Sequence, residues 1–273
     1  MSDDAARDQL FRKPVVYALP DMDSVTVTRD REFVVSGGRV LTMDIYYPPA
    51  PSATLRPAIF IPSAYPDLGF EARLGLRFKD IGWASSCARL AAASGVIAIT
   101  ATNVEPAVDA AATLDHVRQH AAALGIDASR LGLWACSGHG PLALWLLMEN
   151  AATPLRCAVL SYAYTLDPDG QFGIAATGRQ FGFVVPVSGK SVADLPEATA
   201  IFLARAGQDE FAHLNDAMDH LTQAGLKENR SITLVNNRDG RHAFDILEDT
   251  DISREVVKSI VAFIAFHLDA NRR

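Results

Sequence analysis

Residues 131–144, LGLWACSGHGPLAL, hold three reactive side chains within four positions: Cys136, Ser137 and His139. An apolar run stops at a cluster of small residues, and a second apolar run with helical spacing follows. This layout presents one side chain on a sharp turn between a strand and a helix. A serine or cysteine in that place can act as a nucleophile when a neighbouring base takes its proton.

Two later segments could supply the base and the acid that such a nucleophile needs. RAGQDE (205–210) places Asp209 after an apolar run, and DGRHAFDIL (239–247) places His242 after another. An imidazole can take the proton of the nucleophile, and a carboxylate can fix the tautomer of that imidazole. We interpret Glu210 as a helix-start acid. Other histidines considered for the base fall in expected helices: His213, His220 and His267.

The elements that must position these side chains are short apolar runs of strand length. They lie at 58–61, 96–101, 130–135, 157–164, 200–207 and 231–236. Helical patterns alternate with most of them, which predicts a mainly parallel sheet with helices on both faces. Ligands of such sheets bind beyond the carboxyl ends of the strands, where Ser137, Asp209 and His242 all fall.

The N-terminal part of the chain has a different hydrophobic pattern. Residues 24–47 alternate around an SGG turn and predict an antiparallel hairpin at the edge of the sheet, with Leu41, Met43 and Ile45 on its one buried face. Residues 1–23 read as a loosely ordered arm, and 24–273 as a single domain. Residues 165–198 show no clear period, so we interpret them as a lid-like insertion.

Taken in order, the three segments resemble the α/β-hydrolase fold over roughly residues 35–268. IDASRLGLWACSGHGPLAL resembles its nucleophile elbow, and DGRHAFDIL resembles the histidine loop of the dienelactone hydrolase-like and acyl-esterase branch. The resemblance implies a serine hydrolase that cleaves a small carboxylic ester or lactone without a cofactor. In it Ser137 is the nucleophile, His242 the base and Asp209 the orienting acid.

The resemblance also implies an oxyanion hole of backbone N–H groups. One donor is Gly138, after the nucleophile, and the other lies near Ala64 and Tyr65, after the first buried strand. The chain departs from the G-x-S-x-G elbow because Ala135 and His139 replace both glycines. It also has PSAY at 62–65, where many esterases have an HGG-type loop.

Cys136 is the main alternative nucleophile, because dienelactone hydrolases use a cysteine in a G-x-C-x-G elbow. That frame puts Trp134 at the first glycine and shifts the strand by one residue, which reverses every side-chain face. We therefore interpret Cys136 as a small residue beside the serine, and His139 as a helix-start residue. A hydrolase-fold binding module with little turnover, a peptidase and an acyltransferase also stay open.

A substrate pocket is expected where the insertion folds over Ser137. Some of the aromatic residues could instead only pack the insertion onto the body. The expected lining is Tyr65, Cys136, His139, Tyr164, Phe172, Phe181 and Phe183.

Composition and charge limit the partners and the cellular location that we expect. The net charge is −7 and no basic stripe occurs, so we expect no nucleic-acid partner. No signal peptide and no uncharged run of about 20 apolar residues occurs, and the three cysteines follow no framework spacing. We therefore expect a cytoplasmic protein without a membrane partner. A homodimer is the assembly kept open. His116 and His120 with Asp109 could hold a metal, but HxxxH without a convincing third ligand is typical of a solvated helix face, so we predict no metal.

Overall fold

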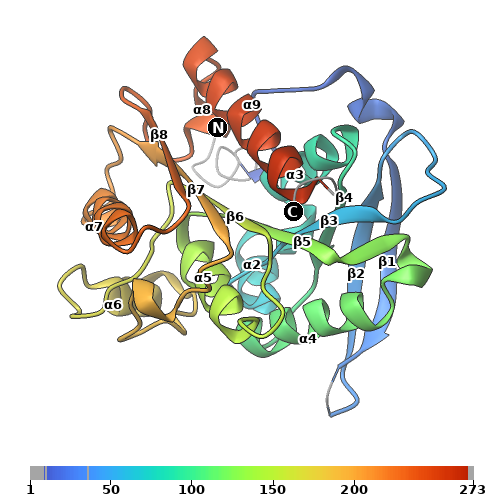
Figure 1. The fold of residues 1–273 in the computed structure, drawn as a ribbon, viewed down its shortest axis with the longest axis horizontal. Coiled ribbons are helices and arrows are strands. Elements are labelled where there is room, and N and C mark those ends of the chain that lie inside the picture. Colours follow the sequence, from blue (N-terminus) through green and yellow to red (C-terminus); the bar gives the residue numbers. More distant parts are fainter. Residues whose placement is uncertain (1–8, 10, 36, 270–273) are drawn as a thin grey trace.

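The computed structural model describes residues 9, 11–35 and 37–269, which contain one sheet with strands in the order β1-β2-β4-β3-β5-β6-β7-β8 (Figure 1). β1 pairs antiparallel with β2, and β2 pairs antiparallel with β4; all other neighbours are parallel. The predicted mainly parallel sheet with an antiparallel N-terminal hairpin is confirmed. The strands are β1 (Thr26–Val34), β2 (Val40–Tyr47), β3 (Arg56–Ile61), β4 (Ile97–Ala101), β5 (Ile126–Cys136), β6 (Cys157–Ser161), β7 (Ala200–Ala206) and β8 (Ile232–Asn237).

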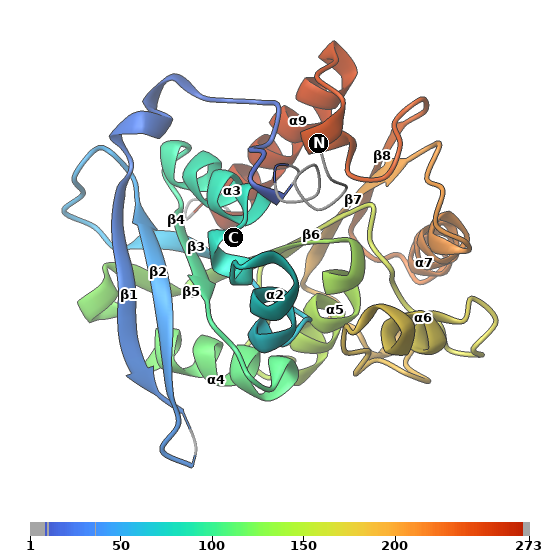
Figure 2. The ribbon, with the colours of Figure 1, turned by 180° about the vertical axis from the view of Figure 1, so that it is seen from behind.

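Helices cover both faces of the sheet, as predicted (Figures 1 and 2). α3 (Gly82–Ala93) and α9 (Asp251–Leu268) pack on one face. α4 (Pro106–Gln119), α5 (Gly140–Glu149) and α7 (Leu214–Lys227) pack on the other. Each face therefore has its own apolar core.

Strand β5 contributes to both cores because successive side chains of a strand point to opposite faces. Leu133 and Ala135 join the core beneath α4, α5 and α7. Trp134 and Cys136 join the core beneath α3 and α9. This alternation along β5 fixes the face to which each side chain points, up to the end of the strand just before Ser137.

Several local expectations differ from the structure. The last strand, β8, comes from the apolar run at 231–236, yet it is an edge strand with most side chains exposed or half-buried. Three helices of eight residues or fewer were not predicted: α2 (Asp67–Leu74), α6 (Ile174–Phe181) and α8 (Phe244–Leu247). Residues 105–125, with Pro106 near the start and Gly125 at the end, predict one continuous helix, but α4 ends at Gln119 and a short 3-10 turn follows it.

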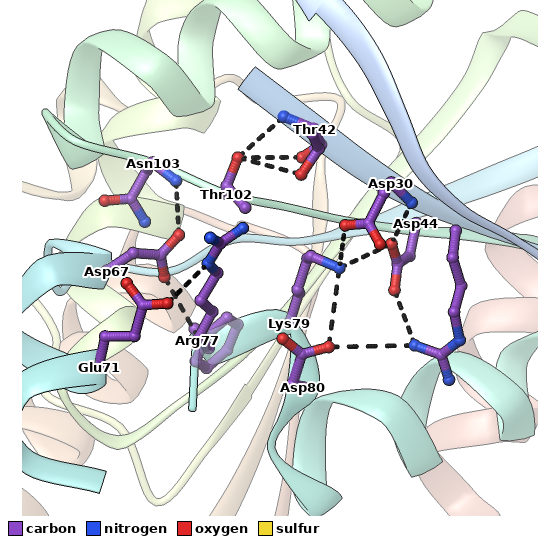
Figure 3. Close-up of polar contacts among 12 residues, drawn as sticks. Asp30, Thr42, Asp44, Asp67, Glu71, Arg77, Lys79, Asp80, Thr102 and Asn103 are labelled. Atoms are coloured by element: carbon purple, nitrogen blue, oxygen red, sulfur yellow. Dashed lines mark hydrogen bonds and ion pairs between the residues drawn. The ribbon is translucent and has the colours of Figure 1, made fainter. Parts of the chain in front are cut away.

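The hairpin was expected to bury one face, but β2 is buried on both, because Asp44 and Tyr46 are fully covered. The carboxylate of Asp44 accepts a 2.9 Å hydrogen bond from the Lys79 ammonium and a 3.1 Å bond from Arg29 (Figure 3). Lys79 also pairs with Asp30 at 2.9 Å. Burial of a charged group is costly unless the group is paired and hydrogen-bonded in this way.

The predicted N-terminal arm is packed from Phe11 onward. Val15 is buried, and its backbone N–H donates to the Ser86 hydroxyl at 3.0 Å. The N–H of Val16 donates to the carbonyl of Asp245 at 2.7 Å. This stretch therefore covers the side of α3 instead of standing apart; residues 1–8 and 10 lie outside the described part of the chain.

Candidate active site

Ser137 lies on the tight turn between β5 and α5, where the sequence placed a presented side chain. Its backbone has a φ of 48°, in the left-handed region that L residues rarely adopt. Such strain costs about 1–3 kcal/mol and persists only where the surrounding structure holds it. Here the carbonyl of Ser137 accepts a 3.1 Å bond from the N–H of Tyr164, just beyond β6.

A chain of hydrogen bonds joins Ser137 to His242 and Asp209. Ser137 Oγ lies 2.9 Å from Nε2 of His242, and Nδ1 of His242 lies 2.7 Å from Oδ2 of Asp209. The side chain of Asp209 is fully buried, and that of His242 is 13% exposed. The carboxylate selects the tautomer with a proton on Nδ1, which leaves Nε2 free to accept the serine proton.

Cys136 does not reach this chain, because the phase of β5 turns its side chain into the core beneath α3 and α9. Burial raises the pKa of its thiol well above the usual value, and the charge of Asp245 raises it further. The thiolate is the reactive form of cysteine, so this environment opposes a nucleophilic role.

His139 is buried between the rings of Phe78 and Tyr65, whose centroids lie 4.3 and 5.1 Å from its own. Its Nδ1 accepts a 2.9 Å hydrogen bond from the backbone N–H of Ala64. Burial lowers the pKa of its imidazole to about 3. The side chain is therefore neutral and tied to the loop after β3.

This bond corrects the expected oxyanion hole, because the N–H of Ala64 is already donated to His139. The neighbouring N–H of Tyr65 makes only a long, local bond of 3.3 Å to Ser63 Oγ. Of the two loop residues expected to donate, Tyr65 therefore has the more weakly bonded N–H.

Gly140 lies next to the histidine that replaces the second glycine of the G-x-S-x-G elbow. A Cβ at Gly140 would collide with the backbone carbonyl of Tyr164, so α5 and the segment after β6 approach each other closely here. In this chain it is Gly140 that leaves no room for a side chain, while the neighbouring His139 carries a ring.

A buried polar cluster next to His242 was not anticipated. Asp245, three residues later, accepts a 2.6 Å bond from the Tyr162 hydroxyl and a 2.9 Å bond from the Trp83 indole N–H. The ring of Tyr162 packs edge-on against His242 at 4.9 Å. Burial raises the pKa of Asp245, although both hydrogen bonds oppose the shift. The sequence signal that could have indicated this cluster is an acid inside the apolar stretch FDIL (244–247), which begins two residues after the histidine.

Three of the expected pocket aromatics gather over the nucleophile turn. A Cβ at Gly138 would lie 2.6 Å from the Tyr65 hydroxyl and 2.7 Å from the ring of Phe183. Phe183 stacks on Tyr164 at 5.4 Å. The insertion is therefore closed down over the turn in this structure, and its Val184 N–H donates to the Ala64 carbonyl at 2.9 Å.

Two other expected pocket residues lie farther out. Phe172 packs against His220, at a centroid distance of 5.6 Å, on the α7 side. Phe181 is 37% exposed and meets Phe211 at 5.9 Å. Sequence reasoning missed Phe211, whose ring lies 4.5 Å from that of His242 and covers the base.

The carboxylate of Asp109, the candidate third ligand beside His116 and His120, accepts the N–H groups of Val104 and Glu105 and pairs with Arg39. Within the described ranges, no group of three or more His, Cys, Asp or Glu residues is arranged to hold a metal ion. Nor does that part of the chain contain a helix of the length and apolarity required to span a membrane.

No protein-family model matches this chain, and no curated protein matches it in sequence. Solved structures do match. Brefeldin A esterase, a bacterial homologue of human hormone sensitive lipase, has a TM-score of 0.72 at 13% identity over 98% of this chain and 84% of that one. A thermostable esterase from Pseudomonas putida gives 0.69 at 16% identity over 99% and 92%.

A mutant of an α/β-hydrolase enzyme from the metagenome of Lake Arreo, Spain, gives a TM-score of 0.67 at 18% identity, over 97% of this chain and 87% of that one. At such identities the likeness shows the fold alone. The chain has the α/β-hydrolase fold, as its motif order predicted.

Proposed function

We propose that this chain is a serine hydrolase that cleaves a small carboxylic ester or lactone through an acyl-enzyme. The observation that carries the proposal is the hydrogen-bonded chain from Ser137 through His242 to the buried carboxylate of Asp209. Strain at Ser137 and the covering of His242 by Tyr162 and Phe211 support it.

In the proposed reaction, Ser137 Oγ attacks the carbonyl carbon while Nε2 of His242 takes its proton. The N–H groups of Gly138 and Tyr65 meet the oxyanion. The tetrahedral intermediate expels the alcohol, which receives the proton from His242. Water then attacks the acyl-enzyme, again giving a proton to His242, and the acid leaves as Ser137 regains its hydrogen. With a lactone, the alcohol and the acid leave as one hydroxy acid.

A small substrate is favoured by the way Tyr65 and Phe183 pack onto Gly138. DGRHAFDIL supports placing the chain in the dienelactone hydrolase-like and acyl-esterase branch. The buried position of Cys136 disfavours the thiol version of that branch. A panel of short-chain esters and lactones would narrow the substrate.

The test uses p-nitrophenyl acetate and a fluorophosphonate probe on the purified protein. We expect Ser137→Ala to abolish hydrolysis and labelling, and mass spectrometry to place the wild-type adduct on Ser137. The buried neighbour offers a matched control, and we expect Cys136→Ala to keep both activities. Loss of p-nitrophenyl acetate hydrolysis in Cys136→Ala but not in Ser137→Ala would indicate a thiol hydrolase. No wild-type adduct at neutral pH would indicate a binding module instead.

A further inference from the structure

We infer that His139 is a positioning residue that holds the loop carrying the second oxyanion donor. The loop is Ser63–Tyr65, directly after β3, and the contact is the bond from the Ala64 N–H to His139 Nδ1. The inference rests on the proposed function, because an oxyanion forms only if Ser137 attacks a carbonyl or a related centre. Nothing in the elbow pattern of the fold calls for a histidine at this position.

The orientation of the loop follows from two anchors on Ala64. Its N–H is fixed by His139, and its carbonyl is fixed by the N–H of Val184 from the insertion. The described backbone has no cis peptide bond, so the N–H of Tyr65 points opposite to the carbonyl of Ala64. Fixing both peptide planes around Ala64 therefore fixes the direction of the Tyr65 N–H.

The anchored loop lies against the nucleophile turn itself. The Tyr65 hydroxyl packs directly on Gly138, the other proposed donor. His139 is two residues after Ser137, so one short segment carries the nucleophile, one donor and the anchor of the second donor. A shift of about 1 Å in such a donor can cost about 100-fold in rate.

The chemical state of His139 suits this role. An imidazole that accepts at Nδ1 carries its proton at Nε2 and is neutral. Burial among Phe78 and Tyr65 keeps it neutral across the range in which an imidazole base works. A protonated ring would present an N–H to the N–H of Ala64 and break the contact.

The test compares two substitutions of His139 in the full chain. In His139→Asn, the side-chain Oδ1 can take the place of Nδ1 as acceptor. In His139→Phe, a ring of similar shape remains but no acceptor does. With p-nitrophenyl acetate, we expect the phenylalanine variant to lose about 10- to 100-fold in kcat with little change in KM. We expect the asparagine variant to recover most of that loss.

Phenylboronic acid separates positioning of the oxyanion hole from general loss of structure, because it becomes tetrahedral when a serine adds to it. We expect its inhibition constant to rise in His139→Phe by the same factor as kcat/KM falls, and to stay near the wild-type value in His139→Asn. Unchanged kcat and boronate affinity in His139→Phe would overturn the inference, as would equal losses in the two variants. If His139→Phe fails to fold, His139→Leu serves the same comparison.

One measurement needs no variant. Long-range ¹H–¹⁵N spectra of the wild-type protein should show one histidine with a bare Nδ1 and a protonated Nε2 that does not titrate between pH 5 and 8. A protonated Nδ1 at His139 would overturn the inference. Failure of the proposed function looks different, because the wild-type chain itself would then neither hydrolyse the ester nor react with the fluorophosphonate.

Discussion

The Tyr162 hydroxyl donates a 2.6 Å hydrogen bond to the buried carboxylate of Asp245. Tyr162 stands just beyond β6 with a φ of 37°, and Asp245 stands in the short helix that follows His242. The contact therefore joins the end of a central strand to the loop that carries the candidate base. The same carboxylate holds the Trp83 indole on α3.

Tyr162→Phe should separate the two roles of this tyrosine. The ring that packs on His242 remains, while the buried carboxylate of Asp245 loses a donor. We expect the free energy of unfolding to fall by about 1–3 kcal/mol, with kcat nearly retained. Urea unfolding and ester hydrolysis measure the two effects. Tyr17→Phe, in the N-terminal stretch, is a control, and an equal loss there would contradict the assignment.

Asp209→Asn should lower kcat by about 10³- to 10⁴-fold, because an amide can leave His242 in the wrong tautomer. Ester hydrolysis at saturating substrate measures this loss. The adjacent acid is the matched control, since Glu210 is exposed and accepts only a 3.4 Å bond from the His242 backbone. Glu210→Gln should change kcat by less than about fivefold. The reverse ranking would exchange the roles of the two acids.

Lys79→Met should lower the free energy of unfolding by about 3–5 kcal/mol. It removes the buried cation beside Asp44, a fully buried carboxylate that keeps only the half-exposed Arg29 as a charged partner. An exposed pair provides the comparison: Lys190 lies 3.3 Å from Asp194 on the insertion, and Lys190→Met should cost less than about 1 kcal/mol. Urea unfolding of both variants checks the difference. Equal costs would mean that burial of Lys79 adds nothing.

Stability should depend on pH through His139. Its pKa is lowered from 6.5 to about 3, so between these values the unfolded chain binds a proton that the folded chain does not. The free energy of unfolding therefore decreases as pH falls through this window, by about 2 kcal/mol from pH 7 to pH 5.

The substitution His139→Asn removes this titration. Its free energy of unfolding should fall by about 2 kcal/mol less than that of the wild type over the same pH interval. Urea unfolding at pH 7 and pH 5 gives both values. Parallel pH profiles for the two proteins would show that His139 is not a buried neutral imidazole.

The sequence by itself determined the sheet, because apolar runs of strand length alternate with helical patterns regardless of distant contacts. It also placed Ser137, Asp209 and His242 after the strands that the structure shows as β5, β7 and β8, and the parallel sheet brings those strand ends to one edge. The dienelactone hydrolase-like branch and the possible homodimer stay predictions.

Only the tertiary structure decided what depends on residues far apart in the chain. The ring of His139 contacts Ala64, 75 positions away, and the burial of Asp44 depends on Lys79. Local periodicity carries no information on such pairs. In the stretch LGLWACSGHGPLAL, strand phase predicted that Ser137 is presented. The role of His139 became visible only when the loop after β3 packed against the turn, because a hydrogen bond needs both partners in place.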